Sequence, residues 1–128
     1  MSDELKVAVV ARDVAGTVAA FTQVLESRGI QVFATIDHGA GATQVGLELG
    51  DEVVIIFGNP AVGTKLMQVD REVGLELPLR VLVWSEGGVT KVGYSDPHEL
   101  AARYDLASAS AVLDGLAGLL EQLVAAVA

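Results

Sequence analysis

The sequence predicts an α+β domain in which helices cover one face of a mostly antiparallel sheet. Three observations predict this class: a strand and a long amphipathic helix open the chain, several strand patterns follow with a short helical insert, and a wide apolar helix closes it. Helices gathered on one face of an antiparallel sheet are typical of such domains. Because the chain has 128 residues, we expect a single domain over 1–128.

Composition limits both the core and the partners. Hydrophobic residues make up 52% of the chain and aromatic residues only 5%, so the core is expected to be aliphatic. The net charge of −9 argues against nucleic acid and against an anionic membrane surface, because phosphates would be repelled. The start MSDELK is too acidic for a signal peptide, and charged residues and glycines interrupt the apolar C-terminal segment. We therefore expect a cytoplasmic protein that does not span a membrane.

The chain is organised around the stretch from Val53 to Gln68 (VVIIFGNPAVGTKLMQ). Five β-branched or aromatic residues predict a strand covered on both faces, and Gly58 allows the chain to turn. Asn59 can cap the helix that follows, with Pro60 at its first position. Gly58 to Lys65 also approaches a phosphate-binding loop, but Thr64 precedes Lys65 where that loop needs the reverse order. The interpretation is strand, cap and short helix.

Elements before this stretch follow the same logic. A strand is expected over Leu5–Ala11, and Asp13 caps a helix whose apolar stripe comprises Val14, Val18, Phe21 and Leu25. Alternation over Ile30–Asp37 predicts a strand with Ile30, Val32, Ala34 and Ile36 on its core side. Small residues at 39–42 indicate a loop, and Val45–Leu49 is a candidate short strand.

Elements after the central stretch begin at Pro78. Strands are expected over Leu79–Trp84 and Val89–Tyr94, joined by a hairpin turn at Glu86-Gly87-Gly88. Asp96, Pro97 and Glu99 open a helix with a cap, a first-turn proline and a capping-box residue. A second helix is expected to begin near Ser108 or Ser110 and to continue to about Val127, with a wide stripe of leucines.

Two of these strands predict self-association. Val53–Phe57 and Leu79–Trp84 carry apolar residues on both sides of the strand, but two main helices can cover only one face of the sheet. An antiparallel sheet with one face in water should alternate. A second copy of the chain is the simplest cover for the other face, so we expect a homodimer through an apolar sheet face.

Several motifs resemble one known family. Asp37-His38, IFGNP at 56–60, GTKLMQ at 63–68, LPLRVLVW at 77–84 and YSDP at 94–97 occur in the order and spacing of the domain of unknown function 302 family. The resemblance covers about Val14 to Leu106. It implies a β-α-β(4)-α arrangement that self-associates, and it implies no activity, substrate or cofactor.

Polar residues at strand ends are the candidate ligand site. Asn59 and Asp96 both follow strands, precede prolines and read as helix caps. If the two strand ends adjoin, two helix N-termini would face one niche and attract a small anionic ligand. We expect that niche near Asp37, His38, Gly58, Asn59, Tyr94 and Asp96, with Lys65 completing it.

Three functions stay open on these residues. The leading hypothesis is a dimeric small-molecule-binding or sensory domain without catalysis of its own. The alternatives are an enzyme with His38 as general base beside Asp37 or Asp96, and a scaffold that serves only assembly. By strand parity His38 is placed on the core side with Ile36. Metal binding is not expected, because the chain has two histidines and no cysteine. The sequence identifies no cofactor.

Overall fold

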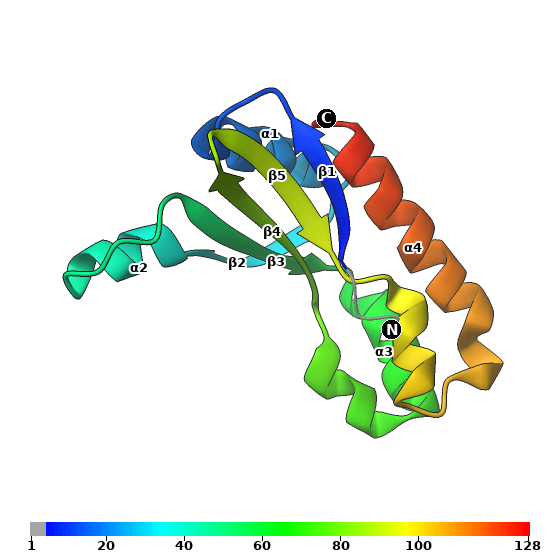
Figure 1. The fold of residues 1–128 in the computed structure, drawn as a ribbon. Helices are drawn as coiled ribbons and strands as arrows, with labels where there is room; N and C mark the ends of the chain where they lie inside the picture. Colours follow the sequence, from blue (N-terminus) through cyan, green and yellow to red (C-terminus); the bar gives the residue numbers. More distant parts are fainter. Residues whose placement is uncertain (1–4) are drawn as a thin grey trace.

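Five antiparallel strands form the centre of the fold (Figure 1). A computed structural model describes residues 5–128, so the first four residues of the acidic start lie outside the described part. The strands are β1 (Lys6–Val10), β2 (Gln31–Asp37), β3 (Glu52–Gly58), β4 (Leu79–Glu86) and β5 (Val89–Tyr94). The helices are α1 (Val14–Ser27), α2 (His38–Gln44), α3 (Pro60–Val69) and α4 (Ser110–Ala125), with 3-10 turns η1 (Arg71–Glu76), η2 (Pro97–Ala102) and η3 (Ala107–Ala109).

The order of the strands is β1-β5-β4-β3-β2, and every neighbouring pair is antiparallel. β4 therefore lies in the middle of the sheet, and β1 and β2 form its edges. Helices α1 and α4 contact each other and pack against the same sheet face. The predicted α+β class and the β-α-β(4)-α order are confirmed, with α2 and α3 as insertions between strands.

The main core lies between that sheet face and the two long helices. Val53, Ile55 and Phe57 alternate along β3 and point into it, with 8%, 0% and 0% of their surface exposed. The ring of Phe57 meets the ring of Phe21 from α1 edge to face, with centroids 5.5 Å apart. As the composition predicts, aliphatic residues fill the rest of this core.

A second, smaller core lies where α3 meets α4 (Figure 1). It contains Leu66 of α3, Val73 of η1, Leu100 of η2 and the first part of α4 through Leu113 and Leu116. Leu79, at the start of β4, packs against both cores. The two cores therefore share one seam at this end of the sheet.

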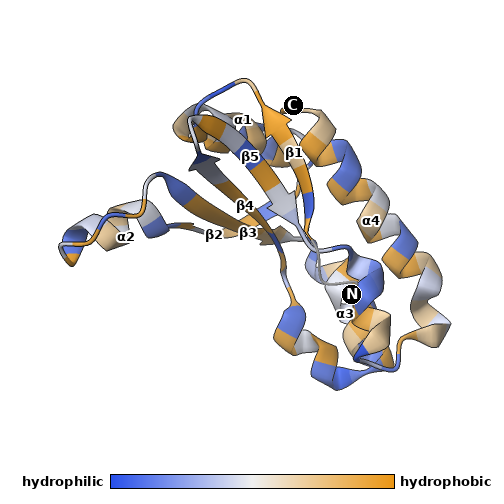
Figure 2. Cartoon of the chain, in the orientation of Figure 1, coloured by the Kyte–Doolittle hydropathy of each residue, from blue (hydrophilic) through white to orange (hydrophobic). Residues whose placement is uncertain are grey.

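The other face of the sheet carries apolar side chains and no helix of the described part packs over its centre. We call it the open face and define it by these outward-pointing residues: Val7, Val9, Ala34, Ile36, Val54, Ile56, Leu82 and Trp84. Val9 is 63% exposed and Val7 50%. Figure 2 shows hydrophobic colour running along the strands. The indole of Trp84 lies over Gly93 of β5, where an added Cβ would come within 3.0 Å of the ring.

Strand β2 differs from its prediction. The register shifts between Val32 and Ala34, which is a bulge at Phe33. Val32 still packs against the main core. Beyond the bulge the parity is reversed, because Ala34 and Ile36 lie opposite Ile56 and Val54 of the open face. The prediction that all four alternating residues share the core side is therefore wrong for Ala34 and Ile36.

The segment after β2 also differs. Residues 39–42, predicted as a loop, belong to helix α2, which Asp37 caps through the backbone N–H of Ala40 at 2.8 Å. The predicted strand Val45–Leu49 is irregular chain that returns from α2 to β3. Residues 38–51 extend away from the body of the protein (Figure 1), and we call them the arm. Three large apolar residues of the arm are exposed: Val45, Leu47 and Leu49.

The C-terminal helical segment is the part of residues 5–128 that meets a length and hydropathy test for a membrane span, over Ala107–Ala125. The core helix of a protein that does not cross a membrane passes the same test. Here Leu113, Leu116, Leu120 and Leu123 are buried in the two cores. The apolar stripe of α4 is thus buried against other parts of the same chain.

Candidate functional site

The predicted site residues do not form one niche. β2 runs antiparallel to β3, and Asp37 lies beside Val53 at the start of β3. Asn59 follows the end of the same strand, so about 20 Å of strand separates the two, at about 3.4 Å per residue. His38 is exposed at the first residue of α2. The prediction of a shared niche, and the placement of His38 on the core side, are therefore wrong.

Asn59 and Asp96 do lie at the same end of the sheet, because β3 and β5 both end there with β4 between them. The backbone N–H groups at the two helix starts, however, already have partners within the chain. The side chain of Asn59 accepts from the N–H of Ala61 at 3.0 Å, and its carbonyl accepts from Val62 and Gly63. Asp96 accepts from His98 and Glu99 in the same way. These helix starts are capped from within the chain, which leaves few free donors for an anion.

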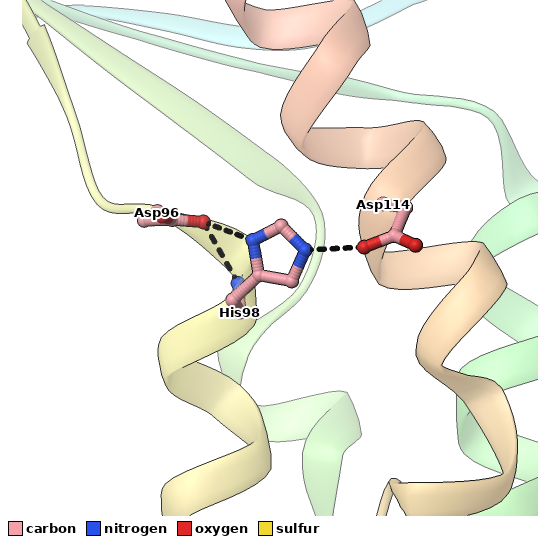
Figure 3. Close-up of polar contacts among 3 residues, drawn as sticks. All are labelled: Asp96, His98 and Asp114. Carbon is pink, nitrogen blue, oxygen red and sulfur yellow. Dashed lines mark hydrogen bonds and ion pairs between the residues drawn. The ribbon is translucent and has the colours of Figure 1, made fainter.

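A histidine bridge ties η2 to α4 beside that end of the sheet (Figure 3). The Nδ1 of His98 lies 2.8 Å from Asp96 Oδ1, and its Nε2 lies 2.6 Å from Asp114 Oδ1. A neutral imidazole carries only one N–H, so both contacts are hydrogen bonds only when the ring is protonated. The carboxylate of Asp114, and then that of Asp96, raise the pKa of His98 above its ordinary value.

This bridge makes stability depend on pH. A raised pKa in the folded chain means that the contribution of His98 is complete below its unfolded value of about 6.5 and is lost as the pH rises through the folded pKa. We expect His98→Gln to lower the free energy of unfolding at low pH and to match the parent chain at high pH. The difference should stay below about 1 kcal/mol, because the ring is exposed. Urea unfolding across that pH range measures it.

The control for this experiment is His38→Gln, which removes an exposed histidine from the opposite end of the sheet. It should keep the pH profile of the parent chain. Asp96 adds an opposite trend at acid pH, because the N–H of His98 lowers the pKa of its carboxyl and its contribution is lost as the pH falls through that value. A His98→Gln difference that grows as the pH rises would contradict the bridge.

Tyr94 and Asp96 line a cavity of about 380 Å³ beside η2 and the start of β4. Its wall carries both signs of charge, with Glu76, Glu99, Arg80 and Arg103 among its lining residues. Arg103 is held by Glu76 at 3.2 Å, and Tyr104 donates to the same carboxylate at 2.8 Å. Partial burial, and then the charges of Glu121 and Asp96, raise the pKa of Tyr94. Within this wall, Glu76 and Arg103 are therefore paired with each other.

A larger and more apolar cavity opens at the seam between the two cores. We call it the seam pocket. It has a volume of about 510 Å³ and is lined by Arg28, Ile30, Phe33, Gly58, Asn59, Pro60, Val62, Gly63, Thr64, Met67, Gly74, Leu77, Pro78, Leu79, Leu116 and Leu119. Most of its aliphatic side chains are only half-buried. Two predicted residues, Gly58 and Asn59, therefore lie at a cavity, but Lys65 is exposed on α3 and is not among the lining residues.

Sequence reasoning missed most of the seam pocket. Its lining comes from the end of α1, the bulge in β2, α3, the segment before β4 and the middle of α4. No short motif joins these segments, so only the tertiary fold brings Phe33, Met67 and Leu119 together. The one local signal was Gly63 in α3, which offers no side chain to fill the space. Among residues 5–128 no group of three or more His, Asp or Glu is placed to hold a metal ion.

Comparison with known proteins gives one family and one fold. The sequence model described as "Domain of unknown function DUF302" matches residues 6–123. A crystal structure of an uncharacterized conserved DUF302 protein from Bacillus stearothermophilus superposes with a TM-score of 0.78 over 96% of this chain and 94% of that one, at 21% identity. At that identity the likeness concerns the fold alone.

Two curated relatives are longer proteins. Over 100 residues the chain is 45% identical to proteins named fluoride-specific ion channel FluC 1 from Brucella suis and from Brucella abortus. The match covers 77% of this chain but only 39% and 37% of those proteins. The larger part of each relative therefore has no counterpart in the match.

Proposed function

The chain belongs to the family of the domain of unknown function DUF302, and we propose that it is a small-molecule-binding domain whose ligand occupies the seam pocket. The family description assigns no activity, so the proposal depends on the geometry of the site. The observation that carries it is a cavity of about 510 Å³ with half-buried aliphatic walls between two otherwise well-packed cores.

Most side chains that line the seam pocket are apolar. The pocket opens to solvent, and water against its apolar walls lacks hydrogen-bond partners on the protein side. An apolar ligand would gain about 25 cal/mol for each Å² of apolar surface removed from water. The volume also lies within the range of about 300–1,000 Å³ that small-molecule sites occupy. A ligand is therefore a better occupant than solvent.

Binding fits the geometry better than catalysis. A general base must lie within hydrogen-bond reach of the proton that it removes. His38, the candidate base, is exposed on the arm, and Asp37 beside it already caps α2. Asp96, the other proposed partner of His38, lies at the opposite end of the sheet and binds His98. The proposed domain binds its ligand without changing it.

A fluorescent anilinonaphthalene sulfonate dye is a suitable probe for the pocket. The parent chain should bind it saturably, and Gly63→Leu should lose the signal, because a Cβ there contacts Leu77 at 3.7 Å and further atoms would enter the cavity. Gly115→Leu is the matched control, since Gly115 is exposed on a helix with nothing near its added Cβ. Equal dye binding in both variants would refute the seam pocket as the site.

Fluoride is one further probe in this test, because the two curated relatives are named as fluoride-specific channels. In each of them the matched part is less than two fifths of the protein. Because the helix starts at Asn59 and Asp96 are capped from within, this domain offers little to a free halide. We propose ligand binding, not ion conduction, for the domain, and sodium fluoride should displace no more dye than sodium chloride does.

We further propose that the domain works as a homodimer through the open face. Val54 and Ile56 of β3 and Leu82 and Trp84 of β4 form an apolar centre that no helix of the described part covers. Exposed apolar patches of this kind mark association surfaces. Sedimentation of the unmodified chain at micromolar concentration should give about twice the mass of 13.3 kDa. A single 13.3 kDa species would remove this part of the proposal.

A further inference from the structure

The seam pocket has one charged residue among its lining residues, and it is an arginine. Arg28 follows the last turn of α1 and lines the pocket with the polar residues Asn59 and Thr64. Its Nη1 donates to Gln122 Oε1 of α4 at 3.1 Å. The side chain of Arg28 is exposed, and because a guanidinium has five N–H donors in a planar fork, the contact with Gln122 leaves donors for another partner.

The chemistry of that partner follows from charge. A guanidinium is always protonated, and carboxylates match its fork with two parallel hydrogen bonds. Two further polar groups of the wall have partners within the chain: Asn59 Oδ1 accepts from Ala61, and Thr64 Oγ1 donates to the Pro60 carbonyl at 2.6 Å. The seam pocket has one cation and mostly apolar walls, so it suits a ligand with an apolar body and one negatively charged end.

The neighbouring cavity beside η2 serves as an internal comparison. It carries Glu76, Asp96 and Glu99 as well as two arginines. Arg103 there already holds the Glu76 carboxylate at 3.2 Å. That wall presents three carboxylates beside its two arginines, whereas the seam pocket presents no carboxylate. The two cavities are therefore not equivalent for an anion.

We propose that the seam pocket binds amphipathic monocarboxylic acids, with the aliphatic or aromatic body along Met67, Leu77 and Leu119 and the carboxylate at Arg28. This inference rests on the proposed ligand-binding function and specifies its ligand class. The small anionic ligand expected from the sequence is thereby assigned to Arg28 and not to the helix starts at Asn59 and Asp96.

Titration calorimetry with octanoate and 1-octanol separates the two levels of the proposal. Both probes share the apolar body, and only octanoate carries the charge. Octanoate should bind the parent chain about tenfold more tightly than 1-octanol, as a charge-assisted pair with arginine implies. Arg28→Gln should reduce the affinity for octanoate to that for 1-octanol and leave 1-octanol unchanged. Gly63→Leu should abolish binding of both.

The control is Arg71→Gln, which removes an exposed arginine from η1 and should leave both affinities unchanged. If 1-octanol binds as well as octanoate, or if Arg28→Gln has no effect, the acid class is overturned while the pocket stands. If neither probe binds and the dye test also fails, the proposed function itself is overturned. Loss of octanoate binding in Arg71→Gln would likewise overturn the assignment, because it would show a general charge effect.

Discussion

Replacing Phe57 by alanine should lower the free energy of unfolding by about 3–5 kcal/mol. Phe57 has 0% of its surface exposed and lies at the end of β3, where the sheet meets α1. Its ring packs edge to face on Phe21, and such pairs add about 0.5–1.5 kcal/mol to the burial of area. Because domains are stable by only about 5–15 kcal/mol, this loss would leave the chain close to unfolding.

Phe33→Ala is the matched control for that change. Phe33 sits at the bulge of β2 and is 44% exposed, so its truncation should cost less than about 1 kcal/mol. Phe57→Leu should recover a large part of the loss, since it keeps most of the buried volume. Urea unfolding followed by circular dichroism measures all three variants. Equal losses for Phe57→Ala and Phe33→Ala would show that α1 does not pack on the sheet through Phe57.

Strong local patterns predicted most of the fold. The apolar run of β3 is unbroken and that of β4 is interrupted only by Arg80. The Gly87-Gly88 turn and the caps at Asn59 and Asp96 depend on interactions within a few residues. Both glycines of the turn have positive φ angles, 60° and 79°, which only glycine adopts readily. Apolar residues of both parities predicted that β3 is covered on both faces. Within the chain only the face of Val53, Ile55 and Phe57 is covered, and the other belongs to the open face.

The errors arise where structure depends on distant parts of the chain. The bulge at Phe33 inserts one residue against β3, which reverses the face on which Ile36 lies. No sequence pattern between residues 30 and 37 predicts this bulge. In the arm, the alternation over Val45–Leu49 predicts a strand that does not form. A strand needs a partner, and this segment has none among the described strands. A capped helix with Gly39 and Gly41 likewise contradicts helix propensity.

The predicted single niche does not form because of the direction of the strands. Consecutive antiparallel strands end at alternate ends of a sheet, so Asp37, which ends β2, cannot meet Asn59, which ends β3. Asp96 shares an end with Asn59 because two strands, β4 and β5, intervene. The seam pocket at that end was beyond prediction, since Arg28 and Leu119 are brought to it only by the packing of α1 and α4.

Replacing Leu82 by glutamate should convert the proposed homodimer to monomer. Leu82 lies on β4, the central strand, between Val54 on one side and Gly93 on the other, so it sits in the middle of the open face. In a two-fold interface the new carboxylates of both copies would be buried among apolar side chains. Arg80 and Lys91 lie on the same face, and Lys91 is already held by Glu86. Because removing a charge from water costs several kcal/mol even when a partner is near, we expect the dissociation constant to rise at least about 100-fold.

The open face alone is too small for a stable interface, so we expect the arm to take part as well. Five strands about 4.8 Å apart and between five and eight residues long give a flat area of only about 500 Å², whereas stable partners bury about 800 Å² each. The arm extends beyond the sheet and exposes 71% of Val45, 66% of Leu47 and 54% of Leu49. A dimer that also buries the arm would reach the usual area. Leu47→Glu should therefore weaken association as well, by less than Leu82→Glu.

Leu75→Glu is the control for both substitutions, because Leu75 is 84% exposed on η1 and belongs to neither the open face nor the arm. It adds the same charge and should leave the dimer intact. Each chain carries a net charge of −9, so added salt should tighten association by screening the repulsion between copies. Sedimentation equilibrium reports the mass, and thermal unfolding confirms that each variant is folded. A folded Leu82→Glu dimer would place the contact elsewhere and leave the apolar centre of the sheet to another partner.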